Sequence, residues 1–509
     1  MSPLTLFFSS IQSLANKPTT SLLWVVRNAA NYQFHCCFPC SGSTLPILKK
    51  LDEYFAYCRR VTATMPITLE SAFRHFLICI GILILAACDS TDDTPDADTI
   101  YFNGNILTLS AHAEKVTAIA FKNGRVQAIG TRIGVKRHQG DLTEMIDLDG
   151  NTMIPGFIAG NSQFSQLLEQ KGDIEQVQHL FASQGITTLV DIGINNEALT
   201  TLQSQANANK LVLDIIAIPN VSEMEALVDS DQVSFGQYNN RLKVPGFFLA
   251  LDGTASNYSA WMAYPYQEDP DLPESNWRSE PLMPFSIFQN TFQLVVENEL
   301  QLFVHAMGDA AIDAIIQASY DLKLNAGQDQ RHVVMMSRFM RNNQLQQYAK
   351  LGLVACFDTS NIYQEGEDDI EKLGLSRANG QSPIKQALED DLPASNICFP
   401  GPTPPDTIFT LWSAVNRVTK DEEIMGSGLR LSPLQALTAM SEQAAYQFFE
   451  EDNKGELVPG KQADAVILSD NPMSIAPGLI RDIEIIETIK QGKTIYRRPS
   501  TLTSEGNKP

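Results

Sequence analysis

The sequence predicts an α/β protein in which a TIM-like (β/α)8 barrel is joined to a smaller antiparallel β-domain. The chain has 509 residues, of which 44% are hydrophobic, and this is enough apolar material for one large barrel and a second core. Short apolar runs that are mostly separated by helical patterns are typical of a parallel βα barrel. Eight such runs are found at residues 153–160, 186–193, 211–219, 246–252, 300–306, 332–337, 353–358 and 394–399.

Helices of the barrel are best supported in two places. Apolar residues recur at helical spacing from Ala311 to Ala318, directly after the fifth strand, and a second helix is expected at residues 343–351. The first crossover, residues 164–185, is short.

The smaller domain begins near Asp98, where the pattern changes to short alternating strands. Asn103–Asn105 and residues 122–125 are expected to form turns between them. The strand candidates are residues 99–102, 106–109, 118–121 and 126–130.

The net charge limits the classes of partner. A formal charge of −22 argues against nucleic acid or anionic lipid headgroups, because both are bound by basic surfaces. The charge is uneven, since residues 1–64 carry +4 and the remainder therefore carries −22 − 4 = −26.

Residues 1–64 show no sustained helical or strand period, although they hold half of the eight cysteines. A metal knuckle at Cys36, Cys37 and Cys40 is disfavoured because no second ligand pair follows at zinc-like spacing. We interpret this block as an N-terminal extension that arises from a misassigned start codon.

A lipoprotein-type signal peptide is predicted at residues 65–88. Arg74 and His75 precede a dozen apolar residues, Phe76–Ala87, a run too short to span a bilayer. The ending Leu-Ala-Ala-Cys resembles a bacterial lipobox, which implies lipidation of Cys88 as the mature N-terminus; the alternative is a plain signal-anchor helix.

The mature protein is therefore expected to be exported and anchored to a membrane, on the periplasmic side of a bacterial membrane. Asp89 resembles the retention signal for the inner membrane. Residues 89–97 are polar, acidic and interrupted by proline, so they are expected to form a tether.

Two stretches carry a resemblance to a known family. Residues 455–464 read Gly-Glu-Leu-Val-Pro-Gly-Lys-Gln-Ala-Asp, and residues 155–163 read Pro-Gly-Phe-Ile-Ala-Gly-Asn-Ser-Gln. Both resemble signatures of the amidohydrolase superfamily, in the branch of N-substituted formamide deformylase. The resemblance covers nearly all of residues 98–497 and implies a barrel at 153–454, with a β-sandwich built from residues 98–152 and 455–497, the two ends of the mature chain.

The same resemblance implies a metal site, but most of its ligand positions hold other residues. Zinc in active relatives is held by three or four protein ligands. Of the family's ligand positions only His305 keeps its residue, in Val-His-Ala-Met-Gly-Asp at 304–309. The other positions fall on Asn161, Gln163, Phe248, Met336, Asn361, Ile397 and Phe399. We therefore expect no metal.

Candidate catalytic residues are His305, Asp252 and Asp309, and candidate substrate-binding residues are Asn161, Gln163 and Asn361. Structural alternatives stay open. His305 is also explained as a packed, neutral imidazole, Asp309 as a helix cap, and Asp252 as a turn former.

Cys356 and Cys398 fall near the ends of neighbouring strands. They form either a disulfide or two buried thiols.

Three functions follow from these observations. The first is a metal-free, catalytically impaired relative of hydrolases of non-peptide carbon–nitrogen bonds that binds a small molecule in the barrel mouth. The second is an active hydrolase that uses metal-free acid–base chemistry through His305 with Asp252 or Asp309. The third is an interaction scaffold.

Overall fold

A computed structural model describes residues 95–110, 116–160, 163–230, 233–397 and 404–499. All of them belong to one compact unit, Thr94–Pro509. The predicted extension at 1–64, the signal peptide at 65–88 and most of the tether lie outside the described residues. Within the described ranges, no helix has both the length and the apolar character needed to cross a membrane.

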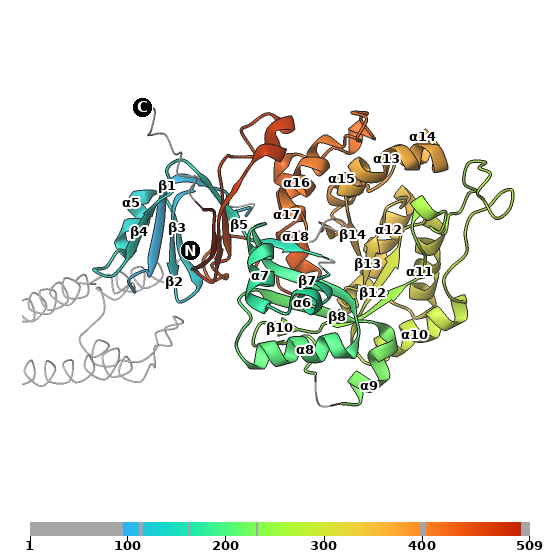
Figure 1. The fold of residues 1–509 in the computed structure, drawn as a ribbon, viewed down its shortest axis with the longest axis horizontal. Coiled ribbons are helices and arrows are strands. Elements are labelled where there is room, and N and C mark those ends of the chain that lie inside the picture. Colours follow the sequence, from blue (N-terminus) through green and yellow to red (C-terminus); the bar gives the residue numbers. More distant parts are fainter. Residues whose placement is uncertain (1–94, 111–115, 161–162, 231–232, 398–403, 500–509) are drawn as a thin grey trace, which may run out of the picture. The chain divides into compact units, whose positions relative to one another are not determined.

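An eight-stranded sheet combines strands from both ends of this unit (Figure 1). Its strands are β1 (Thr99–Ile106), β2 (Val116–Lys122), β3 (Arg125–Gly130), β4 (Glu144–Asp147), β5 (Thr152–Pro155), β16 (Ala465–Leu468), β17 (Ile485–Lys490) and β18 (Lys493–Arg497). The order is β18-β17-β16-β5-β1-β2-β3, and β4 pairs with β1. The antiparallel pair β5–β16 joins the two ends of the chain.

The turn predicted at Asn103–Asn105 is wrong, because these residues continue β1. The register between β1 and β2 shifts between Phe102 and Ile106, and Asn103 takes a positive φ of 61°. Gly104 is required at this irregularity because a Cβ there would lie 2.5 Å from the main-chain oxygen of Asn151. The Asn-Gly signal therefore marks a kink within a strand.

Two five-stranded sheets hold the eight strands expected for the barrel. The first contains β6 (Phe157–Ala159), β7 (Ile186–Ile194), β8 (Asp214–Pro219), β10 (Leu242–Lys243) and β9 (Tyr238–Asn239). The second contains β11 (Gly246–Ala250), β12 (Gln301–Ala306), β13 (Val333–Met336), β14 (Val354–Phe357) and β15 (Ala394–Asn396). All pairings except β9–β10 are parallel, so the expected α/β class with parallel sheets is confirmed.

Three details of the strand prediction are corrected. The run at 153–160 divides into β5 and β6, which belong to different sheets, so the boundary expected after residue 152 falls inside β5. The third strand begins at Asp214 rather than at 211, and the eighth ends at Asn396. The two-residue strands β9 and β10 have no apolar run in the sequence and were not predicted.

The two parallel sheets approach each other in two places, after β8 and at the edge formed by β6 and β15. An isolated parallel bridge joins Asn220, after β8, to Phe248 in β11. At the other edge, a Cβ on Gly160 would lie 2.3 Å from Cδ1 of Ile397, which shows how closely the ends of β6 and β15 approach.

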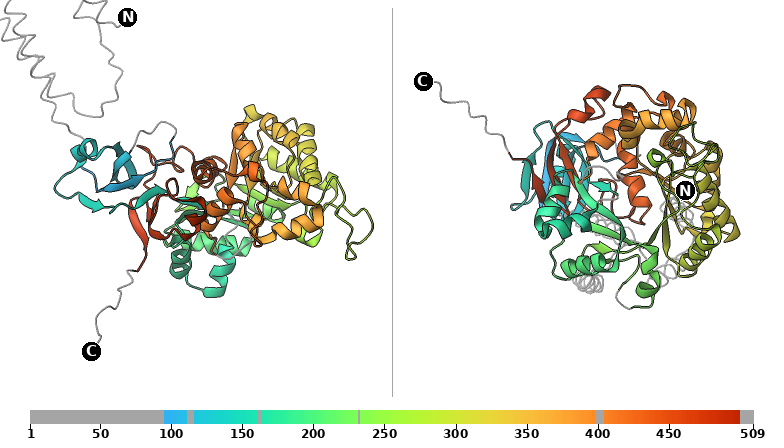
Figure 2. Two further views of the ribbon diagram at one scale, coloured as in Figure 1. Left: turned by 90° about the horizontal axis from the view of Figure 1, so that it is seen from above. Right: turned by 45° about the vertical axis from the view of Figure 1, so that its right-hand side comes forward.

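Helices cover the outside of the parallel strands (Figure 2). They are α6 (Phe164–Lys171), α7 (Ile174–Ala182), α8 (Asn196–Asn207), α9 (Met224–Val228), α10 (Phe285–Glu297), α11 (Asp309–Asp321), α12 (Asn342–Leu351), α13 (Ser360–Leu373), α14 (Leu375–Asn379), α15 (Ile384–Glu389), α16 (Thr407–Asn416), α17 (Pro433–Ala439) and α18 (Glu442–Tyr446). The short helix α5 (Arg132–Val135) lies instead on the eight-stranded sheet. Helices α11 and α12 confirm the two helices expected from the sequence.

Successive residues of the parallel strands belong to two different apolar clusters. In β8, Ile215 and Ala217 pack toward the helices, whereas Ile216 and Ile218 pack on the opposite side of the strands. The same alternation holds in β6, β12 and β14. Because side chains of a strand alternate between its faces, each parallel sheet is buried on both sides.

A buried charge network ties the eight-stranded sheet to the parallel strands. The ammonium group of Lys490, at the end of β17, lies 2.6 Å from carboxylate oxygens of both Asp214 and Asp464, and Lys454 lies 2.7 Å from Asp214. Burial alone would raise the pKa of Asp214, but Lys490 and Lys454 outweigh it and hold that pKa well below its usual range. The ionised carboxylate therefore stabilises the fold at neutral pH and loses this effect as the pH falls below about 4.

We expect Lys490→Met to lower the free energy of unfolding by about 3–5 kcal/mol, because it leaves the buried carboxylate of Asp464 without its cation. Urea unfolding at neutral pH measures this loss. Lys493→Met, at an exposed site in the same hairpin, is the matched control and should change stability little. Adding Asp464→Asn to Lys490→Met should restore part of the loss; no recovery would show that the ion pair is not its source.

Candidate functional site

The side chain of Asp252, directly after β11, is an acceptor for three main-chain N–H groups. Its Oδ1 accepts from Met307 at 2.8 Å, and its Oδ2 accepts from Gly308 at 2.8 Å and from Trp261 at 3.0 Å. The residue is 1% exposed. Through these three hydrogen bonds the side chain joins the segment that follows β12 to the long loop between β11 and α10.

His305, in β12, is brought against Asp252. Its Nδ1 lies 3.1 Å from the main-chain oxygen of Asp252 and 3.5 Å from Oδ1. Because a carbonyl oxygen only accepts, Nδ1 carries a proton in this contact, and in the neutral form of the ring Nε2 has the lone pair. The side chain is 20% exposed, and Nε2 has no hydrogen-bond partner among the described residues. The arrangement is an oriented imidazole that is able to accept a proton at Nε2.

Asp309 does not cap helix α11, which corrects that expectation. Gly308 is the N-cap and Asp309 is the first helical residue. Its carboxylate accepts a hydrogen bond from the main-chain N–H of Ala263 at 2.7 Å and pairs with Arg341 at 3.2 Å. Burial raises the pKa of Asp309, and the Ala263 hydrogen bond and Arg341 oppose this effect.

Asp252 and Asp309 thus both hold the loop of residues 251–284, which begins at the end of β11 and leads into α10. A Cβ on Gly308 would lie 2.0 Å from the main-chain oxygen of Trp261, so only glycine permits this close approach. The loop is also fixed from the other side, where Lys372 donates to the main-chain oxygen of Ser256 at 2.9 Å. The two aspartates that the sequence offers as catalytic candidates therefore have a clear structural role.

Three positions at which the family resemblance expects metal-site residues are occupied by packed apolar side chains. Phe248, Met336 and Ile397 lie in one apolar cluster with Met307 and Cys356. Met336 also breaks the alternation of β13. Its φ of 75° directs it to the same cluster as Met335, which precedes it.

The described positions at which the sequence has an amide in place of a family histidine do not lie in one place. Gln163 is the N-cap residue of α6 with a φ of 48°, and Asn361 is buried at the start of α13. Asn161 and Phe399 lie outside the described residues. The structure thus brings His305 and Asp252 together, but it does not gather the predicted polar residues into one group.

These donors do not fit a zinc site. Across the described residues, no group of three or more His, Cys, Asp or Glu side chains lies close enough to hold a metal ion. His332 directly precedes β13, at the opposite end of that strand, and burial lowers its pKa to about 3. A zinc ion needs three or four nitrogen, oxygen or sulfur ligands, whereas Phe248 and Ile397 offer none and the thioether of Met336 suits soft metals.

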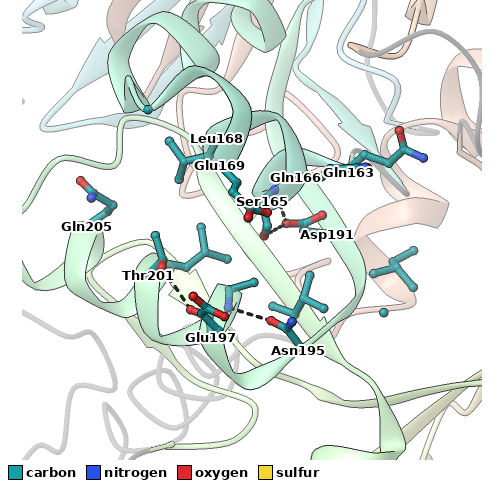
Figure 3. Close-up of a pocket in the computed structure, with 16 residues that line it drawn as sticks. Gln163, Ser165, Gln166, Leu168, Glu169, Asp191, Asn195, Glu197, Thr201 and Gln205 are labelled. Atoms are coloured by element: carbon teal, nitrogen blue, oxygen red, sulfur yellow. Dashed lines mark hydrogen bonds between the residues drawn. The ribbon is translucent and has the colours of Figure 1, made fainter.

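A cavity of about 610 Å³ lies between α6 and α8, beside the C-terminal end of β7 (Figure 3). Its charged lining residues are Glu169, Asp191 and Glu197, and the lining has no basic side chain. Asp191 accepts hydrogen bonds from the main-chain N–H groups of Phe164 at 3.1 Å and Ser165 at 2.8 Å, which fixes the start of α6. Burial raises the pKa of Asp191, although the bonds to Ser165 and Phe164 oppose it. Gln163 lines the same cavity.

One buried group near the strand ends was missed by the sequence analysis. Arg338, just after β13, is 1% exposed and pairs with Glu365 and Asp369 of α13. Burial raises the pKa of Asp369 to about 6, against the opposing charge of Arg338. The sequence offered a signal, because two carboxylates four residues apart lie on one helical face. Their common partner, Arg338 in the loop after β13, was not visible.

Cys356 is a buried free thiol, and burial raises its pKa to about 12. Cys398 lies outside the described residues. Of the two alternatives, a disulfide or two buried thiols, the described half is therefore a buried thiol at Cys356.

The chain is similar in sequence and in fold to known proteins. A model of the "Amidohydrolase family" matches residues 163–496. Protein LONG AFTER FAR-RED 3 from Arabidopsis thaliana is 24% identical over 338 residues, which are 62% of this chain and 55% of that protein. N-substituted formamide deformylase from Arthrobacter pascens is 25% identical over 214 residues, which are 39% of this chain and 37% of the deformylase. The chain thus spans about half, or less, of the length of these curated relatives.

Among solved structures, an uncharacterized metal-dependent hydrolase from Pyrococcus furiosus superposes with a TM-score of 0.63 at 17% identity. The superposition covers 74% of this chain and 100% of that one. The likeness shows a shared fold.

We expect Asp252→Asn to lower the free energy of unfolding by about 3 kcal/mol. The three main-chain N–H groups now donate to two carboxylate oxygens, whereas the amide of asparagine has only one acceptor oxygen. Loop 251–284 should also be cleaved faster by proteases in the native state. The matched control is Asp271→Asn, an exposed carboxylate in the same loop. Equal stability and equal cleavage in the two variants would show that Asp252 does not hold the loop.

Proposed function

Because the chain belongs to the amidohydrolase family, we propose that it uses the family's barrel to bind a small molecule and that it has lost the family's metal. We also propose that the two parallel sheets close into one barrel, with a β-sandwich beside it. One observation carries the functional proposal: Phe248, Met336 and Ile397, at positions where the family resemblance expects metal-site residues, pack in one apolar cluster. Restoring a ligand there would require a polar group within a close-packed interior, which costs stability unless it is paired.

The ligand is proposed to enter the cavity between α6 and α8. The cavity is large enough for a drug-sized molecule. Its lining combines two carboxylates from facing helices, Glu169 and Glu197, with the amides of Gln163 and Gln166. With no basic side chain in the lining, the cavity favours a neutral or cationic ligand over an anion.

We further propose that the protein is exported and anchored by a lipid at Cys88. The support is the sequence alone: a short apolar run that ends in Leu-Ala-Ala-Cys, followed by an acidic tether. Cys88 and the signal peptide lie outside the described residues.

The metal-free proposal predicts that the purified mature chain holds well under one equivalent of zinc, iron or manganese. A chelator should leave its melting temperature unchanged, because no structural metal is removed. Small organic amines should raise the melting temperature, because their binding stabilises the native state. The free energy of unfolding should rise by about 2.7 kcal/mol when the free amine concentration is one hundred times the Kd.

The controls separate the two parts of this prediction. Glu169→Gln with Glu197→Gln should abolish the shift from amines, whereas Glu175→Gln with Glu225→Gln, on exposed positions of α7 and α9, should not. Near-stoichiometric zinc that disappears in His305→Ala would overturn the metal-free proposal.

A second function is favoured by the contact between His305 and Asp252, namely hydrolysis of a non-peptide carbon–nitrogen bond without a metal. In this scheme Nε2 of His305 takes a proton from water, the water oxygen adds to the carbonyl carbon, and the carbon–nitrogen bond breaks. Nε2 then returns the proton to the leaving amine. Asp252 keeps the imidazole oriented through Nδ1.

If this second function operates, hydrolysis of formamides or N-acyl amines by the wild type should fall by about 10²–10⁴-fold in His305→Ala. His305→Gln should be equally inactive because glutamine offers hydrogen bonds but no titrating nitrogen. His332→Gln is the control for the loss of a buried imidazole. Residual hydrolysis that is equal in all three variants would exclude His305 as the base.

A further inference from the structure

The segment Thr131–Leu142, here called the α5 segment, carries the two most exposed large hydrophobic side chains among the described residues. Ile133 is 88% exposed and Leu142 is 98% exposed. The segment contains α5, a 3-10 turn (Lys136–His138) and the loop that leads to β4. It lies on the side of the eight-stranded sheet away from the barrel helices (Figures 1 and 2). Isolated exposed apolar residues are common on soluble proteins, but two nearly complete exposures in one short segment are not.

The charge of the α5 segment is opposite to that of the rest of the chain. It holds exposed Arg132, Lys136 and Arg137 against a single exposed acidic residue, Asp141, which gives 3 − 1 = +2. Residues 65–509 as a whole carry −26 by the same count as above. Asp96 and Glu144 border the segment and bring the local total to 3 − 3 = 0, which is still far from the strongly negative charge of the rest of the chain.

The α5 segment also surrounds the point where the described chain begins. The main-chain N–H of Ala97 donates to the oxygen of His138 at 2.7 Å, and Thr143 Oγ1 donates to the oxygen of Ala97 at 2.7 Å. Val135 of α5 packs in one cluster with Ala97. The described chain therefore begins in contact with the α5 segment and its neighbour Thr143.

We propose that the α5 segment rests on the phospholipid surface of the membrane. Ile133 and Leu142 enter the headgroup region, and Arg132, Lys136 and Arg137 lie next to lipid phosphates. Apolar side chains flanked by cations are the combination that binds the interface between water and lipid.

The length of the chain outside the structure supports this occupant, and the inference here rests on the proposed lipid anchor. From Cys88 to Pro95 there are 95 − 88 = 7 residue steps, which span at most about 25 Å when fully extended. A lipid on Cys88 would therefore hold the α5 segment within about this distance of the bilayer.

The net charge of the chain does not forbid this contact. Charges further than about 8 Å from the surface are largely screened at physiological ionic strength, so the local charge of the α5 segment decides the interaction. The expectation that the acidic chain avoids anionic lipids is thus limited to its other faces.

The test uses the mature chain, residues 88–509, as Cys88→Ser, so that no lipid anchor contributes. Its binding to vesicles of phosphatidylethanolamine and phosphatidylglycerol is measured by cosedimentation at millimolar lipid. Ile133→Glu with Leu142→Glu should reduce the partition coefficient by about tenfold or more, and Lys136→Glu with Arg137→Glu should do the same. Leu375→Glu with Leu479→Glu, at positions 58% and 54% exposed on other elements, is the matched control and should leave binding unchanged.

The outcomes are distinct. Raising the salt from about 0.1 M to about 1 M should weaken wild-type binding and should have little effect on the charge-reversed variant. Absent binding, or binding that the control pair lowers as much as the Ile133 and Leu142 pair, would overturn the proposal. Mass spectrometry of the chain purified from membranes tests the lipid on Cys88 separately, so failure of the anchor is distinguishable from failure of the α5 segment.

Discussion

Close packing on both faces of the parallel strands is the constraint on which the rest of this structure depends. A side chain on one face must pack against helices, and its neighbour must pack on the opposite side, so neither face offers water to a polar group. Inward positions near the strand ends thus have two stable solutions: polar groups that satisfy one another or a ligand, or apolar groups that pack. Phe248, Met336 and Ile397 follow the second solution, whereas His305 and Asp252 follow the first.

Much of the fold was predictable because apolar runs of strand length mark its strands in the sequence. Apolar runs located all eight strands, and the motif at 455–464 indicated that the two ends of the chain belong together. The division of residues 153–160 was not predictable, since one continuous apolar run serves two sheets and the break at Gly156 has no distinct pattern. The turn prediction at Asn103–Asn105 was wrong because the residues that favour a turn also tolerate the positive φ of a kinked strand.

The site was only partly predictable, for a different reason. The sequence shows which side chains are present but not which main-chain donors they meet. Asp252 finds its donors at Trp261, Met307 and Gly308, the last of them 56 residues away, and this turns a candidate catalytic group into an anchor for a loop. The positive φ values of Met336 and Ser337, 75° and 28°, were equally invisible. Strain of this kind in bulky residues persists only where the surroundings enforce it, and here it lies at a predicted ligand position.

The position of β16 has a consequence for how the protein is made. This strand pairs with β5 on one side and β17 on the other, so residues 465–468 occupy the middle of a sheet whose other strands begin at Thr99. Until those residues have been synthesised, β5 presents an unpaired edge and the sheet stays incomplete. Long-range pairing of this kind is slow to form, and it delays completion of the native state until almost the whole polypeptide is available.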